Sequence, residues 1–253
     1  MIAVSSTEVH LWCCRTDLGE AELADRETLL SLPERERAAR FRDPLSRVTF
    51  VAARGWLRQV LAGYTGVAPR DLLFRATDFG KPMLVEQRGI PHVSFNLSHS
   101  GHLAIVAVAG GMPIGVDIER VRPVSLALAG ESFAPGEIAA LDALAPERRD
   151  EGFMRCWTRK EAYLKALGIG LDAPLDSFEV SLAPSEPARL VAVRGAPQEA
   201  GRWQIAHLDP GPGYCGAVAA PCRGWPWRWK ARPDDASRSR KLQSRAALVP
   251  VFP

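Results

Sequence analysis

The stretches GVDIE at residues 115–119 and WTRKEAYLK at residues 157–165 carry most of the information in this chain. If the first is a strand, its side chains alternate, so Asp117 and Glu119 leave it on one face. If the second is a helix, Glu161 and Lys165 are one turn apart and share a face. Three carboxylates beside an ammonium suit a hard divalent cation that holds a phosphate, because Mg²⁺ prefers a few carboxylate oxygens and leaves its other positions to water and phosphates.

Each of these groups also has a simpler explanation. Asp117 and Glu119 could lie at a strand end where water solvates them, and Glu161 and Lys165 could form a surface salt bridge of little consequence. The surroundings favour a site, because the strand is otherwise apolar and unpaired carboxylates inside a sheet are costly. Gly115, on the same face as the acids, is expected to leave room for a ligand.

Composition places the chain among soluble globular proteins. Its 253 residues are 47% apolar and 24% charged, enough for one large domain or two small ones. No apolar run approaches the roughly 20 residues that cross a bilayer, and no basic segment precedes an apolar one at the N-terminus. Five cysteines without a CxxC pair argue against a disulfide framework or a zinc site. We therefore expect a cytoplasmic protein with no membrane partner.

The net charge of +3 is unevenly distributed. Residues 222–253 hold eight Arg or Lys against two Asp, whereas the other 221 residues hold 24 basic and 27 acidic side chains. The body is thus no basic nucleic-acid binder, and we expect no nucleic-acid partner. The Trp- and Arg-rich end alone could contact nucleic acid or an anionic surface. A flexible, loosely packed tail is the favoured interpretation.

The pattern of residues predicts an α+β fold, with strands and helices in similar amounts in each half. Predicted strands lie at residues 8–13, 93–97, 103–108, 114–119, 178–182, 189–193, 203–208 and 214–219. Predicted helices lie at residues 31–41, 45–62, 125–131, 135–144 and 147–167, with Gly63 and Gly168 as two of the helix ends. We expect lobes at residues 1–110 and 111–221, followed by the tail at 222–253. Small-ligand sites usually form at such a lobe interface.

Two further motifs carry polar groups. FNLSHSG at residues 95–101 places Ser98 and His99 where a strand becomes a turn, and a hydroxyl and an imidazole can donate to phosphate oxygens there. A serine hydrolase is excluded, because no GxSxG elbow is present and adjacent Ser and His residues do not easily form a triad. Lys81 in the GKP turn and Arg37 on a basic helix are weak signals alone, since solvated basic residues are common.

In order along the chain, a basic helix, GKP, FNLSHSG, GVDIE and WTRKEAYLKALGIGL resemble the 4′-phosphopantetheinyl transferases of the single-chain, surfactin-synthetase-activating (Sfp) type. The resemblance spans residues 33–180. It implies a pseudo-dimer of two similar α+β lobes, with coenzyme A and Mg²⁺ (for which Mn²⁺ can substitute) between them. It also implies transfer of the phosphopantetheine arm to a serine of an apo acyl, aryl or peptidyl carrier protein, with release of adenosine 3′,5′-bisphosphate.

The resemblance also implies the metal-binding and catalytic residues. By position, Asp117, Glu119 and Glu161 look like the magnesium ligands. Lys165 looks like the lysine that contacts the α-phosphate of the coenzyme's pyrophosphate. We expect Glu161 to accept the proton of the attacking serine, directly or through a metal-bound water.

The same comparison implies the coenzyme contacts. Ser98 and His99 look like contacts to the coenzyme's phosphates, with His99 at the 3′-phosphate. Lys81 resembles the lysine of the nucleotide-binding turn, and Arg37 the basic residue of the first helix. Two alternatives stay open: an idle relative that binds coenzyme A or a carrier without transfer, and a Mg²⁺-dependent nucleotide pyrophosphatase. A two-lobe chain needs no second copy, so we expect a monomer.

Overall fold

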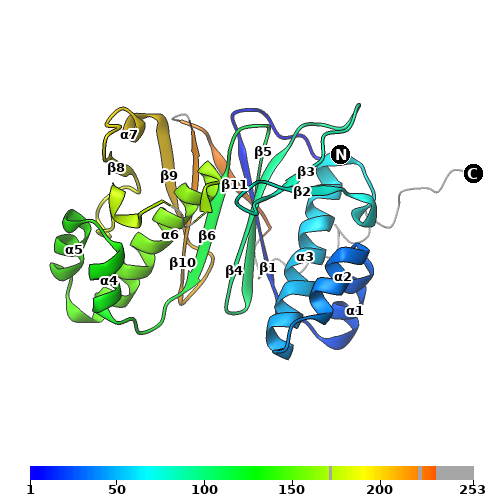
Figure 1. Cartoon of the computed structure of the whole chain (residues 1–253), viewed down its shortest axis with the longest axis horizontal. Coiled ribbons are helices and arrows are strands. Elements are labelled where there is room, and N and C mark those ends of the chain that lie inside the picture. Colours follow the sequence, from blue (N-terminus) through cyan, green and yellow to red (C-terminus); the bar gives the residue numbers. More distant parts are fainter. Residues whose placement is uncertain (171–172, 222–223, 232–253) are drawn as a thin grey trace, which may run out of the picture.

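The chain is arranged in four layers, with two β-sheets in the middle and helices on both flanks (Figure 1). The computed structural model describes residues 1–170, 173–221 and 224–231. No helix in these ranges combines the length and apolarity that a membrane crossing requires. The predicted α+β class is confirmed.

The first sheet is built mainly by the N-terminal half. Strands β1 (Val9–Arg15), β5 (Leu103–Ala109) and β4 (Ser94–Ser100) are antiparallel neighbours in the order β1-β5-β4. The remaining elements of this half are α1 (Glu20–Thr28), α2 (Leu32–Ala39), α3 (Pro44–Thr65), the 3₁₀ turn Pro69–Asp71, β2 (Phe74–Ala76) and β3 (Pro82–Leu84).

Helix α3 covers the outer face of this sheet. Asp43 caps the helix by accepting a hydrogen bond from the Ser46 backbone N–H at 2.8 Å. The helix ends at Gly66, whose φ of 73° lies in the left-handed region, so the predicted end at Gly63 is three residues too early. Trp56 of α3 packs with Val106 of β5 in one buried cluster.

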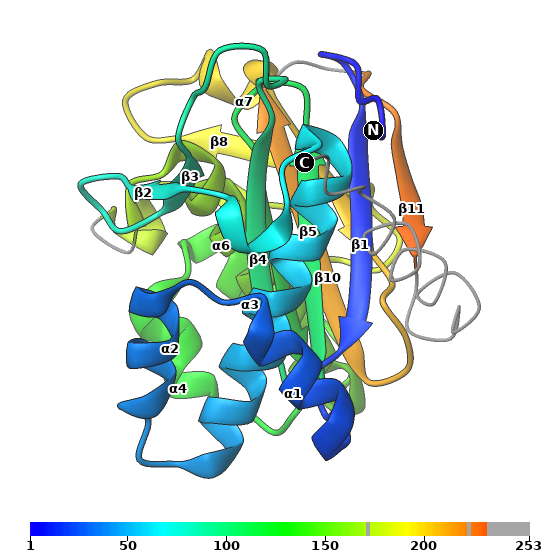
Figure 2. The ribbon, with the colours of Figure 1, turned by 90° about the vertical axis from the view of Figure 1, so that its right-hand side faces the viewer.

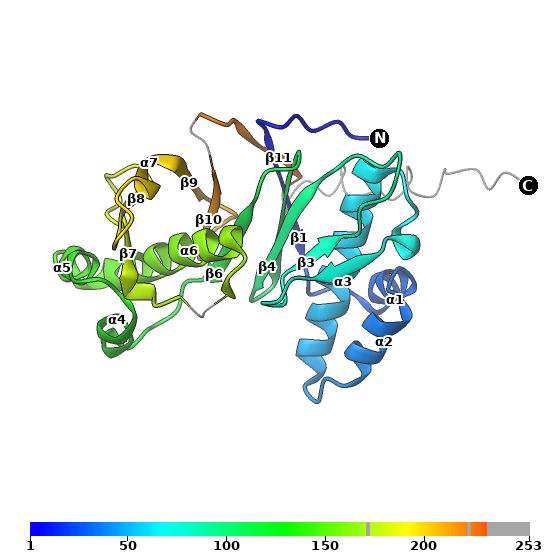
Figure 3. The ribbon, with the colours of Figure 1, turned by 45° about the horizontal axis from the view of Figure 1, so that its top comes forward.

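The second sheet belongs to the C-terminal half. Strands β6 (Gly115–Arg120), β10 (Tyr214–Pro221) and β9 (Trp203–Leu208) are antiparallel in the order β6-β10-β9. Helix α6 (Arg149–Leu167) lies along β6 and β10, as Figure 3 shows. The remaining elements are α4 (Leu126–Ser132), α5 (Pro135–Asp142), α7 (Glu199–Arg202), β7 (Phe178–Val180), β8 (Leu190–Val193) and the 3₁₀ turns Pro146–Arg148 and Leu175–Ser177.

A single apolar layer joins the two sheets. Leu11 and Ile105 of the first sheet form one buried cluster with Val116 and Val218 of the second. Burial of apolar area in this layer holds the halves together. At its edge, β4 of the first sheet runs beside β6 of the second (Figure 3), and the polar motifs of the sequence meet there.

The prediction of a loosely packed tail from residue 222 is wrong for residues 224–231. Strand β11 (Trp227–Ala231) pairs in parallel with β1, opposite Val9 to Trp12, and extends the first sheet (Figure 2). Trp225 is buried in the layer between the sheets. The pairing joins segments some 200 residues apart, so local periodicity carries no sign of it. The rest of the predicted tail, residues 222–223 and 232–253, lies outside the described residues.

Candidate active site

Gly115 brings helix α6 close to strand β6. A Cβ atom at this position would lie 2.0 Å from the Ala162 carbonyl oxygen and 2.3 Å from the Ala166 backbone nitrogen. The space beside Gly115 is therefore filled by the helix backbone, and the expectation that it leaves room for a ligand is wrong. Because α6 lies this close to the strand, Glu161 and Lys165 come over the face of β6 that carries the two acids.

Lys165 is the counter-ion of the acidic strand. Its ammonium lies 2.5 Å from Asp117 Oδ1. Burial raises the pKa of Asp117, against the opposing charge of Lys165. Burial also raises the pKa of Glu119 and of Glu161, and the charges of Asp117 and Glu119 add to the rise at Glu161. The three predicted acids are thus close enough to repel one another.

The described residues contain no ready-made cluster of three or more His, Cys, Asp or Glu side chains that could hold a metal ion. Two carboxylate oxygens of the three acids nevertheless lack a hydrogen-bond partner among the described residues. Asp117 Oδ2 and Glu161 Oε1 are buried and accept no hydrogen bond from any described residue. Such atoms are costly unless a partner compensates them. An all-oxygen donor set with excess negative charge fits Mg²⁺.

Polar side chains of β4 face this strand. The Ser98 hydroxyl donates to Asp117 Oδ1 at 2.8 Å and accepts from Lys165 Nζ at 3.2 Å. Ser98 is 6% exposed. We predict from the sequence that it contacts phosphate, but in the structure its hydroxyl is already engaged with Asp117 and Lys165.

His99 leaves β4 on the opposite face from Ser98, the face that carries Phe95 against α3. Desolvation by its surroundings, followed by the positive charge of Lys165, lowers the pKa of His99. The ring is therefore mainly neutral at pH 7. A neutral imidazole can still donate one N–H to an anion. His99 and Asp117 are nevertheless close enough to interact electrostatically.

Comparison with known proteins connects this geometry to a family. The model of the 4′-phosphopantetheinyl transferase superfamily matches residues 113–219, and that of the 4′-phosphopantetheinyl transferase N-terminal region matches residues 19–110. The 4′-phosphopantetheinyl transferase HetI of Nostoc sp. is 41% identical over 226 residues, which cover 88% of this chain and 92% of that protein. The chain belongs to the 4′-phosphopantetheinyl transferase superfamily.

The chain is thus an enzyme that transfers the 4′-phosphopantetheine group of coenzyme A to carrier proteins. The 4′-phosphopantetheinyl transferase Sfp of Bacillus subtilis is 30% identical over 193 residues, covering 76% of this chain and 83% of that protein. Among solved structures, the holo-[acyl-carrier-protein] synthase of Thermotoga maritima is similar at 21% identity with a TM-score of 0.36, covering 44% of this chain and 62% of that one. The predicted family is confirmed by the two sequence comparisons.

In this transferase Lys81 ties the β2–β3 turn to the C-terminal half. Its ammonium donates to the carbonyl oxygens of Ile114 at 2.9 Å and of Lys165 at 2.5 Å. Burial lowers the pKa of Lys81 to about 8. The Lys165 carbonyl lies in the last turn of α6, where a cation is favourable. Lys81 therefore has a structural role between the halves, whether or not it also contacts a nucleotide.

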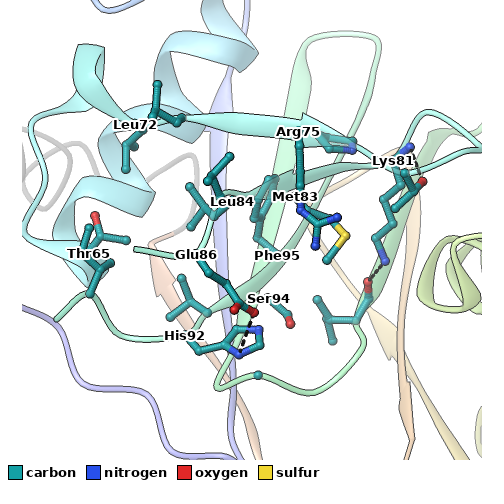
Figure 4. A pocket seen from close by; sticks show the side chains of 18 of the residues that line it. Thr65, Leu72, Arg75, Lys81, Met83, Leu84, Glu86, His92, Ser94 and Phe95 are labelled. Atoms are coloured by element: carbon teal, nitrogen blue, oxygen red, sulfur yellow. Dashed lines mark hydrogen bonds and ion pairs between the residues drawn. The ribbon is translucent and has the colours of Figure 1, made fainter. Parts of the chain in front are cut away.

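A cavity of about 470 Å³ opens beside Lys81 (Figure 4). It is mainly apolar, and its walls include Leu72, Leu84 and Phe95. The close-up shows the Glu86–His92 pair at the opposite side of the cavity from Lys81. None of the three acids of the site lines it. The cavity and the acidic group are separate features of the transferase.

Arg37 lies apart from the acids, on the exposed side of α2. Its guanidinium stacks over the Phe50 ring of α3 at 5.2 Å, and its charge contributes to lowering the pKa of nearby Arg54, for which burial is the main cause. No interaction in the described part of the chain links it to Asp117, Glu119 or Glu161. Its predicted contact with the coenzyme stays a prediction.

Sequence reasoning missed two residues of the site, Asn96 and Ser100. Both lie on the same face of β4 as Ser98 and contact β6. The signal was present, because alternating polar residues on a strand imply one polar face. The motif was instead interpreted as a phosphate-binding turn, so contacts from this face of β4 to β6 were not predicted.

Proposed function

We propose that Asp117, Glu119 and Glu161 hold a Mg²⁺ ion during the transfer. We further propose that the acceptor is a serine of an apo acyl, aryl or peptidyl carrier protein, and that adenosine 3′,5′-bisphosphate is released. The observation that carries the proposal is the unpartnered, buried Asp117 Oδ2 and Glu161 Oε1 in a group of three mutually repelling acids. Mn²⁺ would substitute, since it takes the same ligands.

The reaction needs charge neutralisation and a proton acceptor. A bond forms between the carrier serine Oγ and the β-phosphorus of coenzyme A, and the bond from that phosphorus to the leaving bisphosphate breaks with its electron pair. Bound Mg²⁺ supplies positive charge against the pyrophosphate. The Lys165 ammonium adds positive charge at the α-phosphate. Glu161 takes the serine proton, directly or through a metal-bound water.

The coenzyme would lie across the boundary between the halves. Lys165 reaches from the C-terminal half, while His99, Lys81 and Arg37 come from the N-terminal half. His99 would donate to the 3′-phosphate, and Arg37 would attract it from the surface of α2. Ser98 would act through Asp117 and Lys165, because its hydroxyl is engaged with both.

We also infer that the halves are a structural repeat, a pseudo-dimer in one chain. Leaving aside the shorter helices and the two-stranded sheets β2-β3 and β7-β8, each half runs strand, long helix, strand, strand, and its last strand lies in the interior of its sheet. This common order supports the inference. The N-terminal lobe would be residues 1–110 and the C-terminal lobe residues 111–221. A chain that holds both lobes needs no partner copy, so a monomer would be sufficient.

Intact-protein mass spectrometry tests the function. An apo carrier protein incubated with this chain, coenzyme A and Mg²⁺ should gain the mass of one phosphopantetheine arm, with an equal amount of adenosine 3′,5′-bisphosphate found by chromatography. The gain should vanish with EDTA and with Asp117→Ala. A carrier that stays apo despite measurable coenzyme A binding would indicate an idle relative. Phosphopantetheine released in the absence of any carrier would indicate a pyrophosphatase.

A further inference from the structure

Between the two sheets, side chains of β4 accept hydrogen bonds from backbone N–H groups of β6. Asn96 Oδ1 accepts from the Val116 N–H at 2.9 Å, Ser98 Oγ from the Ile118 N–H at 3.4 Å, and Ser100 Oγ from the Arg120 N–H at 3.1 Å. The three acceptors alternate along β4 and the three donors alternate along β6, so the edges of the strands meet in register. The unpaired N–H groups of β6 are thereby satisfied across the boundary between the halves.

The two serines also bind the acids. A hydroxyl has one proton and two lone pairs, so it can accept from an N–H and donate to a carboxylate at the same time. Ser100 Oγ donates to Glu119 Oε2 at 2.7 Å, and Ser98 Oγ donates to Asp117 Oδ1. Each serine thus binds one acid and also the backbone N–H of the residue that follows that acid in β6. Asn96 makes no such contact with any acid of the site.

This arrangement restricts the orientation of both carboxylates. Each serine engages one oxygen of its acid, and Asp117 Oδ2 stays buried and unpartnered. Glu119 is half-buried, and among the described residues the Ser100 hydroxyl is the hydrogen-bond donor to its carboxylate. Hydrogen bonds to an ionised acceptor are short and strong, so this contact is well suited to fixing a flexible side chain.

We propose that Ser100, with Ser98, is a positioning residue that holds Glu119 and Asp117 in the orientation that binds a divalent cation. The consequence is that cation affinity depends on the docking of the two halves, since the serines and the acids come from opposite sides of the boundary. This inference rests on the proposed Mg²⁺ function. Ser100 is the cleaner test, because its side chain does not contact Lys165 in the structure.

The test compares Ser100→Ala with Asn96→Ala. Both variants lose one hydrogen bond from a backbone N–H of β6, but only Ser100→Ala also loses a hydrogen bond to an acid. Calorimetric titration of Mg²⁺ into protein saturated with coenzyme A should show a Kd about 10- to 100-fold higher for Ser100→Ala. Asn96→Ala should show a lower thermal midpoint with an unchanged Kd. Ser100→Thr keeps the hydroxyl and should restore the wild-type Kd.

The outcomes separate the inference from the function on which it rests. The inference is overturned if wild type and Ser100→Ala bind Mg²⁺ with the same Kd while both alanine variants are merely less stable. The serines would then only stabilise the contact between the two sheets. A wild type that binds no Mg²⁺ and modifies no carrier would instead overturn the proposed function. If Ser100→Ala does not fold, Ser100→Cys keeps the size and weakens the donor, so it must still raise the Kd.

Discussion

Replacing Gly115 by alanine should push helix α6 away from strand β6. The added Cβ would lie 2.0 Å from the Ala162 carbonyl oxygen and 2.3 Å from the Ala166 nitrogen. Non-bonded heavy atoms prefer about 3.5 Å or more, so α6 must retreat by about 1 Å at least. Both clashes are with backbone, and a side-chain rotation cannot relieve them.

The expected cost is large in activity and moderate in stability. Overpacking of this kind costs about 1–3 kcal/mol, which leaves a domain of ordinary stability folded at 25 °C. A displacement of about 1 Å in catalytic groups costs about 100-fold in rate. Because Glu161 and Lys165 move with the helix, Gly115→Ala should lower kcat about 100-fold while the folded protein remains measurable by circular dichroism.

The assay is carrier modification followed over time by mass spectrometry, with unfolding in urea measured on the same preparation. Gly216→Ala, on the neighbouring strand β10, is the matched control, since its Cβ would meet its nearest neighbours at 3.2 Å and require only a small adjustment. It should retain most of the activity. Wild-type kcat in Gly115→Ala would refute the claim that close helix–strand packing positions the site.

Three further substitutions test separate parts of the structure. Glu161→Gln should abolish turnover yet raise the thermal midpoint at pH 7 in EDTA. Burial raises the folded-state pKa of Glu161 above its ordinary 4.5, so the stability from its protonation is present below pH 4.5 and lost as pH rises through the folded pKa. The gain should therefore disappear below pH 4.5, and a midpoint that never exceeds the wild-type value would contradict the repulsion among the acids. Trp225→Ala should lower the free energy of unfolding in urea by about 3–5 kcal/mol, because Trp225 is 4% exposed. Trp227→Ala should lower it far less, because Trp227 is 37% exposed. Equal losses of stability in the two variants would argue against a packed C-terminal segment. Arg37→Ala should raise the KM for coenzyme A and leave kcat unchanged. Arg35→Ala, on the same helix, should leave both KM and kcat unchanged. A fall in kcat with an unchanged KM in Arg37→Ala would place Arg37 outside the coenzyme site.

The regular elements were predictable because each carries its own periodicity. Strand β5 is apolar throughout and α3 has a continuous apolar stripe, so both were predicted within a few residues. Helix α1 was not predicted, since its sequence, EAELADRET, has few apolar residues to mark a buried face. Strand β11 was missed for a different reason. Its pairing with β1 is non-local, and basic residues among its tryptophans resemble those of a solvated tail.

In the candidate site, too, features set by local sequence were predictable and features set by tertiary contacts were not. The sequence identifies Asp117, Glu119, Glu161 and Lys165, because alternation and helical spacing place them on shared faces. The structure brings Lys165 onto Asp117 as expected of an ammonium beside acids. The surroundings of Gly115 were misinterpreted, since whether a glycine faces a ligand or a helix depends on tertiary packing. The hydrogen bonds of Ser98 to Asp117 and Lys165 were not predicted, since they come from the opposite half of the chain.

The most direct test of the central claim is a crystal structure of the transferase with coenzyme A and Mn²⁺, with anomalous scattering recorded for manganese. We predict one peak within about 2–2.3 Å of carboxylate oxygens of Asp117, Glu119 and Glu161, close to the coenzyme's pyrophosphate. Lys165 should then have left Asp117 for the phosphate. A coenzyme bound with no manganese peak at these acids, or with the Lys165–Asp117 ion pair intact, would contradict the account.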